Sequence, residues 1–468
     1  MTLYGGLDVG TSRVKLAVYD EGWRLVRSYS VEAPIEPRGA PRLHDAWKLR
    51  VMVSELLGKA GRLGVRSLGV SVYRGGVAGW RPGGEPMSRI SLWLDVESRL
   101  EAVRSLGFRG RLLGSLPVAS KLMGPLSPMP LIASESRRLA GARVWTVDAL
   151  LSEWLAGSYT GELVNAVTAG LAEPFTGRRV WIVRLAGYRG RPPDVRLHDE
   201  PLGGGGSNLI GPMIADQQSS LLASGCITRS CVKLDLGTGG FADIIASGVL
   251  GALRSQAATP FPALSLSNPR LHLVSIESMA PGIGIAVEAV ASEVGGFGVL
   301  EALDEDRCYS ETGEPIAPYY PVTPKGRLLQ SQPKGRPCSL AAGVALAVAR
   351  MLLEVGGPGC SVVAVGGLSR LTLPLKLAAT LACCRMTVYP GLDASPLGAA
   401  MLAAYSRGDL SLRSLLEGGL RGGGIEFSGC AGRDGLRVVE GWVAAVEGGL
   451  RASRELSKSV WALGGSGS

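Results

Sequence analysis

Two short segments combine an aspartate, glycine and small hydroxyl residues, which are residue types that can bind phosphate. They are Leu7–Ser12, with the sequence LDVGTS, and Leu234–Gly239, with the sequence LDLGTG. Glycine has no Cβ and tolerates positive φ, so backbone N–H groups in such a turn can approach phosphate oxygens closely. The hydroxyl groups add hydrogen-bonding partners, and a carboxylate such as Asp8 or Asp235 suits hydrated magnesium. The two segments together predict phosphate and magnesium binding.

Each segment is followed by an apolar stretch with the pattern of a strand, Val14–Tyr19 in the first copy and Phe241–Ala246 in the second. Both copies therefore predict a strand, a Gly-Thr turn and a second strand. The two aspartates are separated by about half of the chain, which favours two similar domains that each open with a β-hairpin. The alternative is two ordinary hairpins that bind no ligand.

The rest of the chain alternates helix and strand patterns, which predicts an α/β fold with mixed sheets. In the first half, we expect a helix over Trp47–Leu57 and a strand over Leu68–Val72. In the second half, we expect a helix over Ala341–Leu353, a strand over Val362–Val365 and a helix over Thr372–Ala382. Three stretches rich in proline or glycine predict irregular connections, and one more helix is expected near the C-terminus. These segments are Ser115–Pro130, Gly190–Gly206, Thr312–Arg336 and the helix around Val443–Leu456.

Composition fits a folded protein with two large domains. The chain has 468 residues, of which 46% are hydrophobic, and this excludes wholesale disorder. The net charge is +9, but the arginines are scattered and form no basic stripe, so nucleic-acid binding is not expected. The most apolar stretch, Ser339–Val355, contains Arg350 and Glu354, which argues against a membrane span. The N-terminus has no basic region followed by a cleavage site, and we therefore expect a cytoplasmic protein.

Eight cysteines and three histidines show no zinc-finger spacing. Cys226 and Cys231 lie close together, and Cys383 and Cys384 are adjacent, but neither pair has a second pair at the required distance. We expect buried free thiols. A Cys226–Cys231 disulfide is the alternative if the source is a hyperthermophile.

The order of motifs along the chain resembles the actin-like ATPase superfamily and, within it, the FGGY carbohydrate kinases. The resemblance runs from about residue 3 to about residue 405 and is carried by Gly6–Lys15, Leu92–Asp95, Thr146–Leu151, Tyr159–Glu162, Asp216–Leu221, Gly366–Arg370 and Ser395–Ala400. It implies two actin-like (ribonuclease H-like) ATPase domains, with mixed β-sheets flanked by helices and the active site in the interdomain cleft. The implied divisions are an N-terminal domain over 1–230, a C-terminal domain over 231–406 and a Gly-rich extension over 407–468.

The resemblance also implies roles for individual residues. Asp216 matches the family's general base, which takes the proton of the attacking hydroxyl, and a helix-capping role is compatible with it. Asp8 would organise Mg²⁺, and Asp235 is either a second magnesium-organising carboxylate or a structural residue. For Trp93, a position in the core is the alternative, and for Gly366 and Gly367 an ordinary strand-to-helix turn. The implied ATP contacts are Asp8, Gly10, Thr11, Ser12, Gly237, Thr238, Gly366 and Gly367, and the implied acceptor contacts are Arg74, Trp93, Asp95, Asp216 and Gln217.

Departures from the family pattern bear on the acceptor. Glycerol kinases carry an Arg-Glu pair where this chain has Arg74 and Gly75, so glycerol is disfavoured. The opening motif is more like the xylulokinase branch, although the Met-His of that branch is missing too. Pro128 and Leu131 replace a family lysine and tryptophan.

The implied function is ATP- and Mg²⁺-dependent phosphorylation of a small sugar or polyol, with a ketopentose-type sugar favoured. The alternatives are a glycerol kinase and a catalytically degenerate homologue that binds nucleotide or sugar. We expect a small-molecule acceptor and no nucleic-acid or membrane partner. A homodimer is compatible with the sequence.

Overall fold

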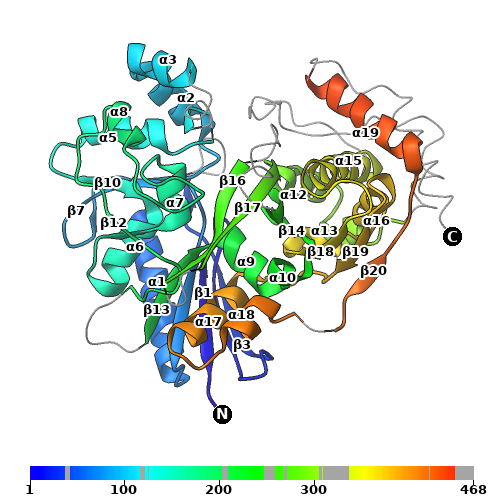
Figure 1. The fold of residues 1–468 in the computed structure, drawn as a ribbon, viewed down its shortest axis with the longest axis horizontal. Helices are drawn as coiled ribbons and strands as arrows, with labels where there is room; N and C mark the ends of the chain where they lie inside the picture. The colour runs from blue at the N-terminus through cyan, green and yellow to red at the C-terminus, as the bar shows by residue number, and fades with distance from the viewer. Residues whose placement is uncertain are drawn as a thin grey trace. The chain divides into compact units, whose positions relative to one another are not determined.

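The computed structural model describes residues 1–36, 43–115, 122–124, 126–202, 209–246, 259–267, 271–304, 308, 337–420 and 422–447. The chain divides into two compact units (Figure 1). Unit 1 comprises Met1–Gly225, Phe261–Val274 and Ser395–Gly419, and unit 2 comprises Cys226–Pro260, Ser275–Ala394 and Leu420–Ser468. The chain therefore passes between the units several times. The domain borders predicted after residues 230 and 406 cut the sequence into continuous pieces, whereas each compact unit combines several separate segments. The borders stay predictions.

A five-stranded sheet lies at the centre of unit 1, with the strand order β13-β6-β1-β2-β3. The strands β1, β2 and β3 are successively antiparallel, whereas β6 is parallel to β1 and β13 is parallel to β6. The carboxyl ends of β1, β6 and β13 consequently lie at one edge of the sheet. The strands are β1 (Tyr4–Val9), β2 (Arg13–Tyr19), β3 (Leu25–Glu32), β6 (Ser67–Val72) and β13 (Ile210–Ala215).

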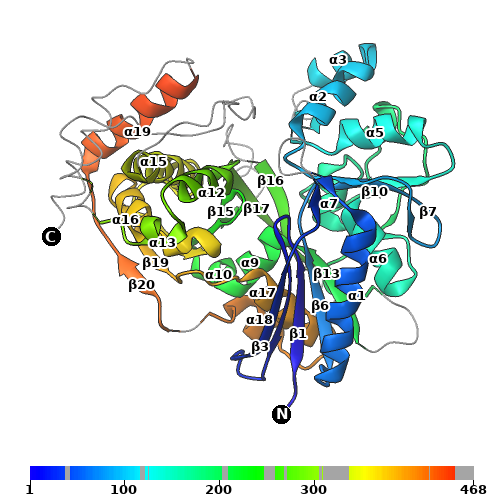
Figure 2. The same cartoon turned by 180° about the vertical axis from the view of Figure 1, so that it is seen from behind.

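Helices α1 (Ala46–Arg62) and α17 (Ser395–Ser406) cover opposite faces of this sheet (Figures 1 and 2). The Asp45 carboxylate caps α1 by accepting a hydrogen bond from Lys48 N at 3.0 Å. The backbone of α17 approaches that of β6 so closely that a Cβ added at Gly69 would lie 1.9 Å from Ala399 O. Glycine is thus required for α17 to pack on the sheet.

Unit 1 contains further β-structure and several helices. A second sheet has the order β10-β7-β9-β5-β4, with β8 paired to β7, and β11 and β12 form a two-stranded sheet. The strands are β4 (Ile35–Glu36), β5 (Leu43–His44), β7 (Val77–Arg81), β8 (Glu85–Pro86), β9 (Ile90–Ser91), β10 (Arg143–Thr146), β11 (Thr160–Glu162) and β12 (Asp194–Arg196). The helices are α2 (Val96–Ser105), α3 (Phe108–Ser115), α5 (Met129–Arg138), α6 (Val147–Ala156), α7 (Leu163–Thr168), α8 (Ile182–Leu185), α9 (Asp216–Ser224) and α18 (Leu412–Glu417).

A seven-stranded sheet, most of whose strands lie in unit 2, repeats the design of the central sheet of unit 1. Its order is β16-β17-β15-β14-β18-β19-β20, in which β14, β15 and β17 are successively antiparallel and β18 and β19 continue parallel to β14. Five neighbouring strands therefore have the same order and directions in both units, as the repeated sequence segments predict. The strands are β14 (Val232–Leu236), β15 (Gly240–Ile245), β16 (Thr259–Leu266), β17 (Leu271–Ala280), β18 (Ser361–Val365), β19 (Arg385–Val388) and β20 (Ile425–Phe427).

Helix α15 (Pro337–Val355) is the long central helix of unit 2. It has 19 residues and a mean hydropathy of 1.8 in its most apolar window, so length and composition alone would allow it to cross a membrane. However, 78% of that window is buried within the structure, as is typical of a core helix. The other helices of unit 2 are α10 (Cys226–Arg229), α12 (Ile283–Glu293), α13 (Phe297–Glu301), the 3₁₀ helix η1 (Gly367–Arg370), α16 (Thr372–Leu381) and α19 (Gly432–Glu447).

All eight cysteines form disulfides, so the expectation of free thiols was wrong. The bridges are Cys226–Cys231, Cys308–Cys338, Cys360–Cys384 and Cys383–Cys430, and every one lies within unit 2. Sequence spacing could not reveal three of these pairs, because the partners are brought together only by the fold. In a cytoplasmic protein, such disulfides are typical of hyperthermophiles.

The predicted strands and helices of both halves are confirmed to within a few residues, whereas two regions near loops differ. The segment Gly190–Gly206, expected to be irregular, contains the short strand β12, and its end at 203–206 lies outside the described residues. The C-terminal helix expected over Val443–Leu456 begins already at Gly432 as α19. The expected connection Thr312–Arg336 lies outside the described residues, as do residues 116–121 and 125 of the expected connection Ser115–Pro130, whose last two residues begin α5.

Candidate functional site

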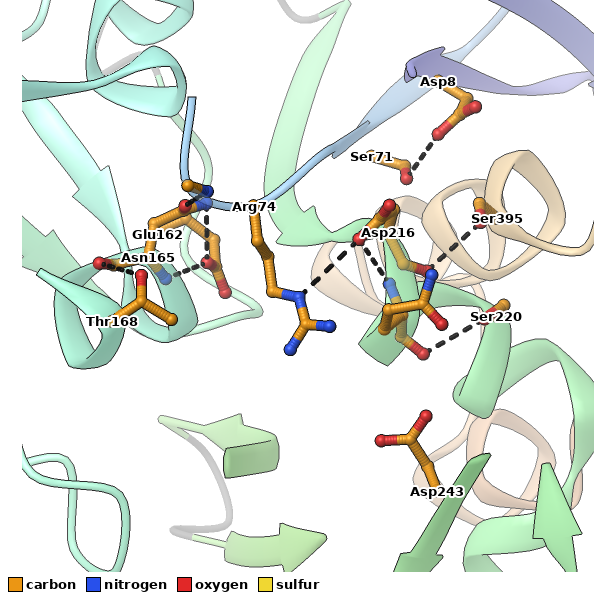
Figure 3. Close-up of polar contacts among 12 residues, drawn as sticks. Asp8, Ser71, Arg74, Glu162, Asn165, Thr168, Asp216, Ser220, Asp243 and Ser395 are labelled. Carbon is orange, nitrogen blue, oxygen red and sulfur yellow. Dashed lines mark hydrogen bonds and ion pairs between the residues drawn. The ribbon is translucent and has the colours of Figure 1, made fainter. Parts of the chain in front are cut away.

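Three predicted site residues of unit 1 lie at the carboxyl ends of adjacent parallel strands. Asp8 is the penultimate residue of β1, Arg74 follows β6 by two residues, and Asp216 directly follows β13 (Figure 3). The register pairs Val9 with Val72 and Val72 with Ala215, so the strands end side by side. Ligands of α/β proteins bind at this edge of a sheet, because the loops and helix N-termini converge there.

The carboxylate of Asp8 is held by a residue that the sequence analysis missed. Ser71 lies opposite Asp8 in the β1–β6 ladder, and its hydroxyl donates to Asp8 Oδ1 at 2.7 Å. The Asp8 residue is only 6% exposed. The Asp8 carboxylate fits a magnesium ion, because Mg²⁺ prefers carboxylate and water ligands. In the sequence, Ser71 is the one polar residue at the apolar end of β6, and this could have indicated its role.

A buried histidine supports the turn of the first hairpin. His44 Nε2 lies 2.8 Å from Thr11 O, which can only accept, so Nε2 carries the proton and donates. His44 Nδ1 then accepts from the Tyr73 hydroxyl at 3.3 Å. Burial lowers the pKa of His44 to about 4, so the ring is neutral at pH 7. The turn is closed by hydrogen bonds from Gly10 N to Arg13 O at 3.0 Å and from Ala33 N to Ser12 O at 2.9 Å.

Asp216 is the first residue of α9 and lies beside Arg74. Its Oδ1 accepts from Gln217 N at 2.8 Å and lies 4.0 Å from Arg74 Nε. The Asp216 side chain is 25% exposed, so a ligand hydroxyl can reach it. Its backbone carbonyl accepts from the Ser395 hydroxyl at 3.1 Å (Figure 3). The carboxylate thus contacts the first turn of α9 and also remains accessible for proton transfer.

The guanidinium of Arg74 stacks on Phe261, a partner that sequence reasoning missed. The Arg74 Cζ lies 4.7 Å from the centre of the Phe261 ring, within cation–π range. Phe261 is distant in sequence and joins unit 1 through β16. No local pattern in the sequence could have linked it to Arg74.

The other predicted acceptor contacts are more buried. Trp93 is 9% exposed and lies next to Gly75, where an added Cβ would be 3.5 Å from Trp93 Cβ. Both oxygens of Asp95 already accept hydrogen bonds, from Ser98 N at 3.3 Å and from the Ser91 hydroxyl at 2.7 Å, so Asp95 caps α2. Gln217 is 5% exposed within α9. Trp93 thus lies beside Gly75, the residue that follows Arg74, whereas Asp95 caps α2.

In unit 2, the second hairpin and the predicted adenosine segment lie together. Asp235 pairs with Val365 in the β14–β18 ladder, and Gly366 follows at the end of β18. Gly366 has φ +95°, and a Cβ there would lie 2.5 Å from both Asp235 Oδ1 and Leu236 O. By contrast, a Cβ at Gly367 would meet no atom within 4 Å. The open backbone at Gly367 fits the close approach of a nucleotide.

The turn of the second hairpin contacts the start of α12. Gly237 N donates to Gly239 O at 2.9 Å, and Gly284 N donates to Thr238 O at 3.1 Å. Behind the turn, Lys233 Nζ and Asp243 Oδ2 form an ion pair of 2.7 Å between fully buried side chains on opposing strands. The sequence analysis missed this pair. Removal of either residue would leave the other charge buried without this ion pair, which is strongly destabilising.

No family model matches the chain. Curated relatives include a glycerol kinase from Delftia acidovorans, 28% identical over 303 residues, and glycerol kinase 5 from Gallus gallus, 28% identical over 293 residues. The first alignment covers 56% of this chain and 59% of the relative, and the second covers 53% and 56%. The chain thus spans little more than half the length of the curated relatives it matches.

Solved structures match over nearly the whole chain. A Plasmodium falciparum glycerol kinase with ADP superposes with a TM-score of 0.74 at 16% identity, covering 95% of this chain and 97% of that one. A ligand-bound xylulose kinase from Lactobacillus acidophilus gives 0.71 at 14% identity, covering 94% and 96%. The fold is that of the actin-like carbohydrate kinases. A gluconate kinase from Lactobacillus acidophilus gives 0.70 at 13% identity, covering 99% of each chain.

Within this carbohydrate-kinase fold, the predicted site residues form two sets, one in each unit. The repeated strand order explains the division, because each unit places its own hairpin beside the ends of its own parallel strands. The first set is Asp8, Gly10, Thr11, Ser12, Arg74, Trp93, Asp95, Asp216 and Gln217, and the second is Asp235, Gly237, Thr238, Gly366 and Gly367.

Proposed function

We propose that the protein is an FGGY-type carbohydrate kinase that transfers the γ-phosphoryl group of ATP to a hydroxyl of a small sugar or polyol. The observation that carries the proposal is the position of Asp216. It begins a helix at the carboxyl end of a parallel strand, it is a quarter exposed, and it lies beside Arg74. A carboxylate in such a place can accept the proton of an attacking hydroxyl, while the arginine orients the acceptor.

The remaining residues fit the needs of a magnesium nucleotide. Asp8, held by Ser71, would bind Mg²⁺ through water, and the ion when bound neutralises charge on the phosphates. In unit 2, the Gly237–Thr238 turn would contact phosphate oxygens, and the backbone at Gly366 and Gly367 would contact the adenosine. Asp235 serves as a second carboxylate for magnesium in this proposal.

The acceptor is proposed to be a ketopentose-type sugar. Gly75 provides no carboxylate beside Arg74, which disfavours glycerol if glycerol must be gripped by an Arg-Glu pair. Glycerol kinase activity is the second candidate, and the curated relatives named glycerol kinase favour it. Both candidates use the same base, so the chemistry of Asp216 does not distinguish them.

The test is acceptor-stimulated ADP release from Mg-ATP, measured against a panel of ketopentoses, ketohexoses, aldonates, glycerol, erythritol and inositols. One acceptor is expected to stimulate release, and Asp216→Asn is expected to lower that stimulated rate by about 10²–10⁴-fold, the range for loss of a general base. ATP binding should persist in the variant, because Asp216 contacts the acceptor.

Stimulation that survives in Asp216→Asn would contradict the assignment of the base. ATP binding without stimulation by any acceptor would favour a nucleotide-binding homologue that has lost catalysis.

A further inference from the structure

A buried chain of hydrogen bonds in unit 1 connects the backbone beside Arg74 with strand β16. Gly75 N donates to Asn165 Oδ1 at 3.0 Å, and Asn165 Nδ2 donates to Glu162 Oε2 at 3.4 Å (Figure 3). Glu162 Oε1 lies 2.9 Å from His198 Nε2, and His198 Nδ1 accepts from Ser265 N at 3.0 Å. The exposed fractions of Asn165, Glu162 and His198 are 0%, 3% and 0%. The sequence analysis gave none of these residues a role in the site.

The hydrogen-bond partners of His198 show which of its ring nitrogens carries the proton. Ser265 N–H can only donate, so His198 Nδ1 carries no proton and Nε2–H donates to Glu162. Glu162 also accepts from Asn165 N at 2.9 Å and from the Asn165 side chain. Both carboxylate oxygens of Glu162 thus accept hydrogen bonds from neighbouring donors.

Both ends of this series of hydrogen bonds lie near Arg74. At one end, Asn165 holds the N–H of Gly75, the residue after Arg74, while buried Arg99 donates to the carbonyl of Gly75. At the other end, Ser265 lies on β16, the strand that places Phe261 against the Arg74 guanidinium. The peptide that follows Arg74 and the strand beneath its side chain are therefore tied to the same buried carboxylate.

We propose that Glu162, Asn165 and His198 are positioning residues that aim Arg74 at the acceptor beside Asp216. The proposal rests on the proposed kinase function. Because Arg74 is assigned to the acceptor and the nucleotide contacts lie elsewhere, the three residues govern acceptor affinity and leave ATP affinity unchanged. Gly75, with φ +74°, gives this peptide a conformation that other residues adopt poorly, so the peptide depends on its partners.

An amide cannot replace the carboxylate at position 162. If the amide nitrogen of Glu162→Gln faces His198, two donors meet at Nε2–H. If it faces Asn165, it meets the backbone N–H of that residue. One hydrogen bond of the chain is lost in either orientation, although size and shape are retained.

The test compares Glu162→Gln and Asn165→Leu with Thr168→Val. Thr168 lies one turn further along α7 and donates to Asn165 O at 2.9 Å without contacting Gly75, so its variant controls for damage to the helix. Glu162→Gln and Asn165→Leu are each expected to raise the acceptor KM about tenfold, as for a lost hydrogen bond to a buried group, with the ATP KM unchanged. Thr168→Val should leave both constants unchanged. Asn165→Ser replaces Asn165→Leu if the larger side chain prevents folding.

A double-variant cycle shows whether the effect passes through Arg74. In an Arg74→Ala background, Asn165→Leu should raise the acceptor KM no further, because the side chain to be aimed is absent. Additive effects in the cycle, or equal rises in the KM for acceptor and ATP, would overturn the proposal.

Hydrogen exchange at the Gly75 amide, measured without substrates, separates this proposal from the proposed function. Exchange should be slow in the wild type and in Thr168→Val and at least about tenfold faster in Asn165→Leu. If no acceptor stimulates ADP release, the kinase proposal fails and this exchange result still decides whether the chain holds the peptide. Equal exchange in all three proteins would overturn the positioning role.

Discussion

The carboxylate of Asp8, a predicted magnesium-binding residue, is oriented by a hydrogen bond from the hydroxyl of Ser71. The serine hydroxyl donates to Oδ1 of the carboxylate at 2.7 Å and so helps to orient the Asp8 side chain. A residue that orients a metal-binding carboxylate commonly influences metal affinity although it never touches the ion.

Ser71→Ala should therefore raise the Mg²⁺ concentration for half-maximal ADP release by about tenfold. Ser67→Ala is the matched control, because Ser67 is a buried serine at the other end of the same strand. Magnesium titrations of both variants test this. An equal shift in the two variants would show that burial of a serine in β6 matters, and that the contact with Asp8 does not.

His44 predicts a specific dependence of stability on pH. The folded-state pKa of about 4 is below the usual 6.5, so the unfolded chain binds more protons between these values and stability falls as the pH falls. From pH 7 to pH 5, the contribution of His44 to the free energy of unfolding should drop by about 2 kcal/mol. Urea unfolding of the wild type and of His44→Gln at both pH values measures the difference. Parallel pH profiles of the two proteins would contradict it.

At the residue scale, the sequence indicated chemical types but not their partners. Asp8 was predicted as a site residue because a carboxylate beside a Gly-Thr turn suits phosphate and magnesium, and Asp216 because Asp216–Leu221 resembles a family segment. Ser71 and Phe261 were missed because their contacts depend on strand pairing and on a return of the chain to unit 1. The capping of α2 by Asp95 was also missed, although it is a local contact and Asp is a favoured N-cap residue.

At the scale of elements, the strand end that carries Gly366 is the most constrained turn of the candidate nucleotide site. The backbone there has φ +95° and runs against Asp235 and Leu236. Any side chain would have to displace the carboxylate and the neighbouring carbonyl.

Gly366→Ala should lower the free energy of unfolding by about 2 kcal/mol or more, because strain at positive φ adds to the steric conflict. Gly367→Ala, one residue further on and facing open space, should change it by less than about 0.5 kcal/mol. Denaturant unfolding of the two variants provides the comparison. A similar loss of unfolding free energy in both variants would mean that the cost of a side chain here comes from helix η1 and not from the contact with Asp235.

Elements were predicted well where apolar periodicity was strong. Both hairpins, α1, β6, α15, β18 and α16 agree with expectation because each has a long buried face or a clear turn. The strand β12 was missed because three residues carry too little periodicity to be recognised. Helix α19 was placed too late, because its glycines at positions 432 and 435 resemble loop residues.

At the scale of the whole molecule, covalent cross-links are confined to unit 2. The Cys383–Cys430 bridge spans 47 residues and ties the end of α16 to the segment that leads into α19. Adjacent Cys384 is bridged to Cys360, so neighbouring residues join two different parts of the chain at one point. Sequence spacing alone offers no means to choose among the many pairings of eight cysteines.

The variant with both Cys383→Ser and Cys430→Ser should lose up to about 4 kcal/mol of stability, since a long loop is freed in the unfolded chain. Hydrogen exchange should accelerate in β20 and α19 and remain unchanged in β1 and β6. Exchange measured with and without a reducing agent in the wild type should show the same regional pattern. Acceleration in β1 and β6 as well would show that the two units do not open independently.

The position of α17 has a consequence for synthesis on the ribosome. This helix packs against strands β1 and β6, whose backbones approach it so closely that glycine is required. Those strands leave the ribosome more than three hundred residues before the helix that covers one face of their sheet. An N-terminal segment that emerges first usually folds first, but here it must wait with an apolar sheet face uncovered. A ribosome stalled before residue 395 should therefore hold a unit 1 that binds chaperones and is readily cleaved by protease, and extension past residue 419 should end both behaviours.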